Sequence, residues 1–167
     1  PSFLSRYPSI QVHVKVINGR IDIVEERIDV ALRARMRLDN DGLLKMRPIG
    51  NSRLILVASP EFARKNCLSS GIDDLAGLPT LTPCFDVGGR KWHFAGPGGR
   101  KALVEHEPRL ACDDMQIVLR SAVDGLGVAL LPEHICRSQL DAGVLTHILP
   151  GWSSGDGLIH AVFTHRK

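Results

Sequence analysis

The chain has 167 residues, of which 44% are hydrophobic and 23% charged, and this is the composition of an ordinary globular protein. Its net charge is only +3 and its basic residues are scattered, so no residue of this segment is expected to bind DNA. No apolar run approaches the ~18 residues that span a membrane, and no secretory signal opens the chain. We therefore expect a cytoplasmic protein without membrane contact. Its four widely spaced cysteines indicate reduced thiols rather than disulfides.

The first third of the chain predicts two strands separated by a short helix. The segment SIQVHVKV alternates apolar and polar residues, which predicts a half-exposed strand over Ile10–Val16. The segment RIDIVEERIDVALR has apolar residues at helical spacing over 21–28 and then at strand spacing over 28–32. Together these elements predict a β-α-β unit with a parallel sheet.

The middle third predicts a loop, two strands, two helices and a hairpin. MRLDNDGLLKMRPIG is typical of a loop, and SRLILVA of a strand. SPEFARKN predicts a helix capped by Ser59. A short helix and a strand near Thr80–Thr82 follow. Lys91–Phe94 and Lys101–Glu105 flank a Gly-Pro-Gly-Gly turn, which predicts a hairpin.

The last third contains the most regular helix, in DDMQIVLRSAVDG, which either Asp113 or Asp114 caps and Gly125 ends. The following strand, Val128–Pro132, is apolar on successive residues, so it is expected to be covered on both faces, as in a parallel α/β sheet. A helix in EHICRSQLDAG and strands in VLTHIL and IHAVFTH complete the chain. Open α/β sheets place ligand clefts at the carboxyl ends of such buried strands.

No pattern in the sequence predicts catalysis, a metal or a cofactor. The seven histidines lack metal-ligand spacing. GLGVAL follows a helix and precedes a strand, whereas a dinucleotide site needs the reverse order. The adjacent Asp113 and Asp114 are typical of helix capping rather than of paired acid and base. We therefore expect no catalytic residue, no metal site, no cofactor and no enzyme activity.

Taken together, several blocks resemble the effector-binding domain of LysR-type transcriptional regulators, in the same order and over essentially the whole chain. This resemblance implies an α/β fold with two Rossmann-like lobes of the periplasmic-binding-protein type, joined by two crossover strands, with a small effector in the cleft between them. The blocks are FLSRYPSIQVHVKVINGRIDIVEERIDVALR, RLILVASPEFARKN, DDLAGLPTL, KWHF with GPGG, AVDGLGVALLPEHI, LDAGVLTHILPGW and HAVFTHRK.

The resemblance also implies domain boundaries. Lobe I would comprise residues 1–57 and 160–167, with its first strand missing, and lobe II residues 58–159. The crossovers would lie near Val57–Pro60 and Leu158–Phe163. In this family a winged helix-turn-helix and a linker helix precede the domain. Both are absent here, so DNA binding is expected only through that N-terminal part.

The expected effector is a small organic acid, and Arg33 at the end of its strand is expected to bind the carboxylate with paired hydrogen bonds. Alternatively, Arg33 pairs with a neighbouring acid and only fixes the strand end. If Asp113 or Asp114 faces the cleft, an amine or amino acid fits better. The predicted effector-binding residues are Asn18, Arg33, Thr82, Pro83, Cys84, Asp113, Asp114 and Met115.

The resemblance further implies a dimer, and a tetramer of the full-length protein, in which Ile10–Val16 of one copy packs against Asp113–Asp124 of the other. Ile117 lies off the core stripe of that helix, so it either contacts the partner or widens the core face. Two other functions remain open: a solute-binding protein of a transport system with the same fold, and a small α/β enzyme. Because lobe I is incomplete, the chain alone is expected to be poorly soluble.

Overall fold

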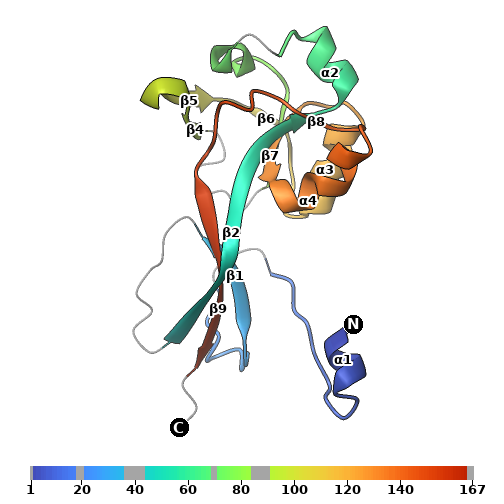
Figure 1. Cartoon of the computed structure of the whole chain (residues 1–167), viewed down its shortest axis with the longest axis vertical. Helices are drawn as coiled ribbons and strands as arrows, with labels where there is room; N and C mark the ends of the chain where they lie inside the picture. The colour runs from blue at the N-terminus through green and yellow to red at the C-terminus, as the bar shows by residue number, and fades with distance from the viewer. Residues whose placement is uncertain (1, 18–20, 36–43, 69–70, 84–90, 165–167) are drawn as a thin grey trace.

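Two long strands run lengthwise through the molecule and join its two halves (Figure 1). The structure, a computed structural model, describes residues 2–17, 21–35, 44–68, 71–83 and 91–164. The long strands are β2 (Leu44–Ala58) and β9 (Asp156–Thr164), and they pair antiparallel. We call residues 54–155 the helical half, and residues 2–53 with 156–164, which include both ends of the chain, the terminal half.

Strand β2 changes partners along its length and so belongs to both halves. Its residues from Leu44 to Arg53 pair with β9, whereas those from Leu54 to Ala58 pair with β7 (Val128–Pro132) and β8 (Thr146–His147). The resulting sheet has the order β1-β9-β2-β7-β3-β6, with β8 also on β2. The halves are therefore joined by continuous hydrogen-bonded backbone.

Strand β7 lies at the centre of the helical half and is buried on both faces, as its apolar run predicts. All five of its residues are buried. Val128 and Leu130 face one hydrophobic cluster with Trp92 and Trp152, whereas Ala129 and Leu131 face a second. It is parallel to β3 (Thr80–Thr82) and antiparallel to β2, so the sheet is mixed rather than wholly parallel.

Helices α3 (Met115–Val123) and α4 (Glu133–Asp141) bury their apolar sides against one face of this sheet. Between α3 and β7, the structure requires both glycines of the sequence Gly-Leu-Gly, each for a different reason. Gly125 has a φ of 75°, in the left-handed region that ends helices. At Gly127 a Cβ would lie 2.4 Å from the Pro79 carbonyl oxygen, so any larger residue would separate β7 from β3.

The opposite face of the sheet is covered by a hairpin and short helices. The hairpin pairs β4 (Lys91–Ala95) with β5 (Lys101–Glu105) through the short 3-10 helix η2 (Pro97–Gly99), as its sequence predicts. Its inward residues join the cluster around Trp92. The helices are α2 (Pro60–Lys65) and the 3-10 helix η1 (Ile72–Leu75), both also expected.

The predicted β-α-β unit at the start of the chain is wrong. A five-residue helix, α1 (Ser2–Arg6), comes first. Residues 10–17 then form no strand, because nothing among the described residues pairs with their backbone, and Val14 and Val16 are 79% and 89% exposed. Apolar alternation alone cannot form a strand, since a strand needs a hydrogen-bonded neighbour.

The predicted helix over 21–28 is a set of turns, closed by a hydrogen bond from the Ile28 amide to the Ile23 carbonyl. The strand that follows, β1 (Ala31–Arg35), does form, but it pairs antiparallel with β9 rather than parallel with residues 10–16. It is an edge strand of the sheet, and its Leu32 side chain is 71% exposed.

Three further predictions need correction. The expected loop over 36–50 already belongs to β2 from Leu44, with a bulge at Pro48–Gly50 that accommodates the proline. The strand expected in VLTHIL is only the two residues of β8. An unpredicted strand, β6 (Pro108–Ala111), forms the far edge of the sheet beside β3, because parallel pairing with β3 gives strand form to a segment of four residues that is too short for a pattern of its own.

Candidate functional site

A cavity of about 370 Å³ lies where the two halves meet. Its walls come from both: from β1 and the first part of β2 in the terminal half, and from β3, β4, α3 and β7 in the helical half. The carboxyl ends of the parallel strands β3 and β7 open toward it, as expected for an α/β ligand site. The lining residues are Ala34, Ser52, Leu54, Thr82, Pro83, Lys91, Trp92, His93, Met115, Leu130, Pro132, Ser154 and Gly157.

One wall of the cavity is a rigid tryptophan. Trp92 is 2% exposed and packs edge-on against Phe94, with ring centroids 6.4 Å apart. The ring of His106 lies 4.0 Å from it, and the His106 Nδ1 atom lies 2.6 Å from the Thr80 hydroxyl oxygen. These contacts fix the indole, so the cavity keeps a preformed apolar wall.

Two buried hydroxyls also reach the cavity. Thr82 is 4% exposed, and its hydroxyl donates to the Pro83 carbonyl at 3.4 Å, which is long for such a bond. Ser52 is 5% exposed, and within the described part of the chain its hydroxyl has no hydrogen-bond partner. The Ser52 oxygen is not among the fully enclosed side-chain atoms that lack a partner, so it is open to the cavity, where a ligand or water can bond to it.

The charged groups around the cavity lie at its mouth. The Lys91 ammonium lies 2.7 Å from the Glu105 carboxylate, and both side chains are more than half exposed. The hydrogen bond from Lys91, with its positive charge, lowers the pKa of Glu105. The lysine therefore meets a ligand with its charge already paired.

The start of α3 borders the cavity through Met115. Asp114 is the N-cap, and its carboxylate accepts a hydrogen bond from the Gln116 amide at 2.7 Å. This decides the capping residue, which the sequence left open between Asp113 and Asp114. The Gln116 amide at the start of α3 is thus bound to the protein's own carboxylate rather than free for an anion.

Among the predicted effector-binding residues, Thr82, Pro83 and Met115 line the cavity. Arg33 is placed differently: Ala34 lines the cavity, and neighbouring residues of a strand point to opposite faces. The Arg33 guanidinium donates to the Ile21 carbonyl at 2.8 Å, a backbone oxygen rather than the acid of its structural alternative. Asp113 and Asp114 are exposed beside the cavity without lining it. Asn18 and Cys84 lie outside the described residues.

Sequence reasoning did not single out Ser52, Trp92, Leu130 or Pro132 as lining residues. The sequence could have indicated Leu130 and Pro132, because the proline ends a buried strand and the carboxyl end of such a strand faces the ligand cleft. For Ser52 no local signal existed: it is one small polar residue between two exposed ones. Its place depends on the change of partner along β2, a non-local feature.

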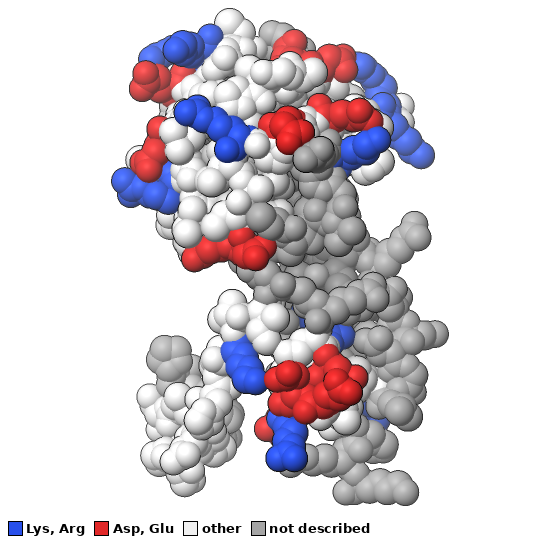
Figure 2. Space-filling view, turned by 180° about the vertical axis from the view of Figure 1, so that it is seen from behind, with Lys and Arg blue, Asp and Glu red and all other residues white. Residues whose placement is uncertain are grey.

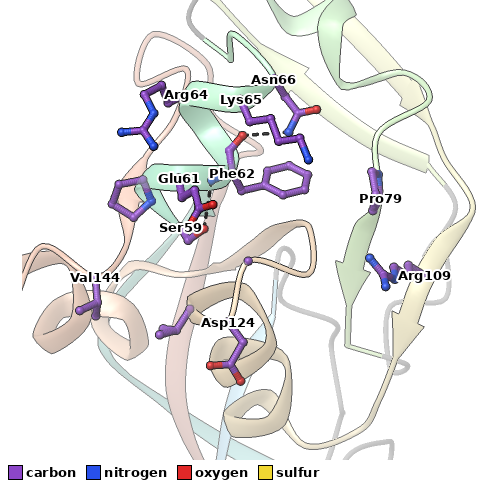
Figure 3. Close-up of a pocket in the computed structure, with 13 residues that line it drawn as sticks. Ser59, Glu61, Phe62, Arg64, Lys65, Asn66, Pro79, Arg109, Asp124 and Val144 are labelled. Carbon is purple, nitrogen blue, oxygen red and sulfur yellow. Dashed lines mark hydrogen bonds between the residues drawn. The ribbon is translucent and has the colours of Figure 1, made fainter.

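A second hollow, a more open groove of about 810 Å³, lies at the outer end of the helical half (Figure 3). Figure 3 shows Arg64 and Lys65 on one side, Asp124 on another and Arg109 across the opening. Its polar groups already have structural partners: the Ser59 hydroxyl accepts from the Phe62 amide, and Arg109 donates to the Leu126 carbonyl. The cavity between the halves is therefore the better ligand site.

The described residues contain no group of three or more His, Cys, Asp or Glu side chains that could hold a metal ion. Burial, and after it the charge of Glu133, raises the pKa of the Cys136 thiol to about 12, so this thiol stays protonated and unreactive.

On the face shown in Figure 2, acidic and basic side chains are interspersed. Across the described chain, no helix has the length and apolar character needed to cross a membrane.

Two halves joined by two long strands, with a preformed cavity between them, define a ligand-binding domain of the periplasmic-binding-protein type. Comparison with known proteins gives its family: the model of the LysR substrate binding domain matches residues 1–167. The chain therefore belongs to the LysR substrate-binding domain family, the ligand-sensing regulatory domains of LysR-type transcriptional regulators. The fold and the family that the sequence resemblance implied are thus confirmed, and a ligand-sensing regulatory role is supported.

The relatives are transcriptional regulators. The chain is 26% identical to PtxR of Pseudomonas aeruginosa over 173 residues, covering 97% of this chain and 51% of that protein. It is 26% identical to the activator TtdR of Escherichia coli K12 over 151 residues, covering 90% and 48%. The chain thus spans about half the length of these curated relatives.

Solved structures agree with this fold. The regulatory domain of AphB from Vibrio vulnificus superposes with a TM-score of 0.85 at 26% identity, covering 99% of this chain and 82% of that one. CrgA of Neisseria meningitidis superposes at 0.82 over 98% of this chain and 54% of that one, and at 24% identity it supports the fold alone.

Proposed function

We propose that this chain senses a small effector in the cavity between its halves and transmits binding to a DNA-binding part of the full-length regulator. The observation that carries the proposal is the cavity itself. Three residues predicted for effector binding, Thr82, Pro83 and Met115, line it beside the fixed indole of Trp92. A concave, largely apolar cavity with a few polar groups is typical of small-molecule sites.

Transmission is proposed to work by closure of one half on the other. A ligand that contacts Ser52 and Thr82 touches both halves at once, so it stabilises the arrangement in which both contacts are made. The lobe division expected from the sequence, 1–57 with 160–167 and 58–159, remains part of this proposal. The change of partner along β2 after Arg53 would move its first boundary slightly toward the N-terminus.

For the effector we propose a small organic acid or an amino acid, and for the full-length protein a homo-oligomer located in the cytoplasm. The relatives are regulators, so a role in solute transport is not favoured, and the described residues of the cavity lining give no set of catalytic side chains that supports an enzyme. The predicted dimer contact has two supporting observations: Ile117 on α3 is 49% exposed, and the apolar residues of 10–17 are exposed as well.

The test is a thermal-shift screen of the chain against a library of small metabolites. A ligand that binds only the folded state at about 100 times its Kd stabilises it by about 2.7 kcal/mol. Met115→Trp, which fills the cavity, is expected to abolish the shift. Gln116→Trp, on the exposed neighbouring position, is the matched control and should retain it. The proposal fails if no compound raises the melting temperature, or if both variants respond alike.

A further inference from the structure

The chemistry of the cavity also restricts the shape of its ligand, an inference that rests on the proposed function. Between the hydroxyls of Ser52 and Thr82 the described lining includes an apolar section, beside the polar residues His93 and Ser154. Leu130 and Pro132 project from the same face of β7, Leu54 from β2 beside them, and Trp92 closes the wall. A ligand that fills this middle section must bury an apolar body against it.

The two hydroxyls lie at opposite ends of that apolar section. On β2, Leu54 is opposite Pro132, so Ser52 lies beyond the end of β7. On β3, Leu81 is beside Ala129, so Thr82 lies level with Leu130. At about 3.3 Å per residue, the two hydroxyls are separated by about 13 Å along the strand direction. One compact polar group therefore cannot satisfy both.

We propose that the effector is an elongated molecule with an aromatic or similarly apolar body and a hydrogen-bonding group at each end, carrying at most one negative charge. Ser52 and Thr82 each bind one end. The charge limit follows from the lining: among the described residues the side chains that can carry positive charge are His93 and Lys91, and Lys91 is exposed and already paired with Glu105. A short dicarboxylate would bury two charges here, and a sugar would bury hydroxyls against Leu54 and Leu130.

The experiment measures thermal shifts and calorimetric Kd values for five probes: 3-(4-hydroxyphenyl)propionate, 4-hydroxyphenylacetate, phenylacetate, succinate and glucose. The two hydroxylated aromatic acids are expected to bind most tightly. Ser52→Ala and Thr82→Val should each weaken them roughly two- to tenfold, the range of one hydrogen bond. Ser138→Ala, an exposed hydroxyl on α4, is the control and should change nothing.

Phenylacetate lacks one polar end, so only one of the two cavity variants should weaken its binding. The inference is overturned if succinate or glucose binds more tightly than the aromatic acids, if no aromatic acid binds, or if neither variant affects binding while the fold is intact. The proposed sensing function survives each of these results when some library compound still binds in the Met115-dependent manner. It fails only when none does.

Discussion

The helical half and the terminal half contain similar apolar sequence patterns but differ in how far these apolar side chains are buried. In β7 of the helical half every residue is buried, between two hydrophobic clusters. In the terminal half, Val12, Val14 and Val16 are 51%, 79% and 89% exposed, and Leu32 of β1 is 71% exposed. Apolar residues on a strand pattern are therefore buried in β7 but largely open in these two segments of the terminal half.

The difference shows that burial depends on neighbours rather than on pattern. Strand β7 has β2 on one side, β3 on the other, and covering elements on both faces. Residues 10–17 have no paired strand within the described chain, and β1 has one, β9. Contiguous exposed apolar surface commonly marks contact with another protein surface, which is consistent with the proposed self-association through this half.

The largest expected effect tests this contrast directly. Leu131→Ala removes a fully buried side chain from the cluster between β7 and the helices, so it should lower the free energy of unfolding by about 2–5 kcal/mol. Leu32→Ala, the same substitution at an exposed strand position, should change it by less than about 0.5 kcal/mol. Urea denaturation followed by circular dichroism measures both. Equal losses would contradict the contrast.

How far the sequence predicts the structure follows the same division. In most of the helical half, β6 and β8 excepted, signals within a few residues were sufficient: Ser59 accepts from the Phe62 amide as an N-cap should, and Gly125 ends α3. The hairpin around Gly-Pro-Gly-Gly was equally local. In the terminal half the same reasoning failed, because pairing of β1 with β9 joins Ala31 to Val162, a contact that no local pattern encodes.

The candidate site shows both cases at once. Thr82, Pro83 and Met115 were predictable, because they stand where a buried strand ends or a helix begins. Ser52 and Trp92 were not, since their place in the cavity depends on how β2 and the hairpin pack on β7. Arg33 was predicted to bind the effector because it stands at the end of a strand. Ala34, the next residue, faces the cavity, so the alternation of side chains along the strand directs Arg33 to the opposite face.

The second prediction concerns the proposed dimer. Ile117 is 49% exposed on α3, and burying it against the apolar terminal half of a partner would explain that exposure. A charge placed in such an interface costs association energy, so Ile117→Glu should weaken the dimer at least about tenfold, or 1.4 kcal/mol. Analytical ultracentrifugation measures this. Gln116→Glu, exposed on the same helix, is the control, and an unchanged Ile117→Glu dimer would exclude this contact.

A third prediction tests the cap of α3 beside the cavity. Because the Asp114 carboxylate accepts from the Gln116 amide, Asp114→Ala should lower the free energy of unfolding by about 1 kcal/mol. Asp114→Ser retains a capping oxygen and should recover most of the loss. Asp74→Ala, at an exposed acid on η1, serves as the control. An Asp114→Ala variant that is as stable as the native chain in thermal denaturation would show that the cap contributes nothing.

The smallest expected effect is a pH dependence of the free energy of unfolding that arises from His147. This residue lies on β8, which pairs with the end of β2. Burial lowers the pKa of His147 on β8, and the charge of Arg53 lowers it further, against the opposing charge of Glu133. Its Nε2 atom is buried without a hydrogen-bond partner in the described part of the chain. The unfolded state therefore binds a proton more readily than the folded state does. Stability is fully present above the unfolded pKa of about 6.5, and it is lost as the pH falls from there toward the lower folded pKa.

Substitution of His147 isolates this contribution from other titrating groups. Between about pH 7.5 and pH 5, the native chain should lose more of its free energy of unfolding than His147→Gln does, because glutamine takes up no proton. The difference should be smaller than the effect of the α3 cap, since His147 is only partly buried and Glu133 offsets part of the cost. His134→Gln, an exposed histidine on α4, should instead follow the native curve. Parallel curves for the native chain and His147→Gln would show that protonation of this imidazole costs the fold nothing.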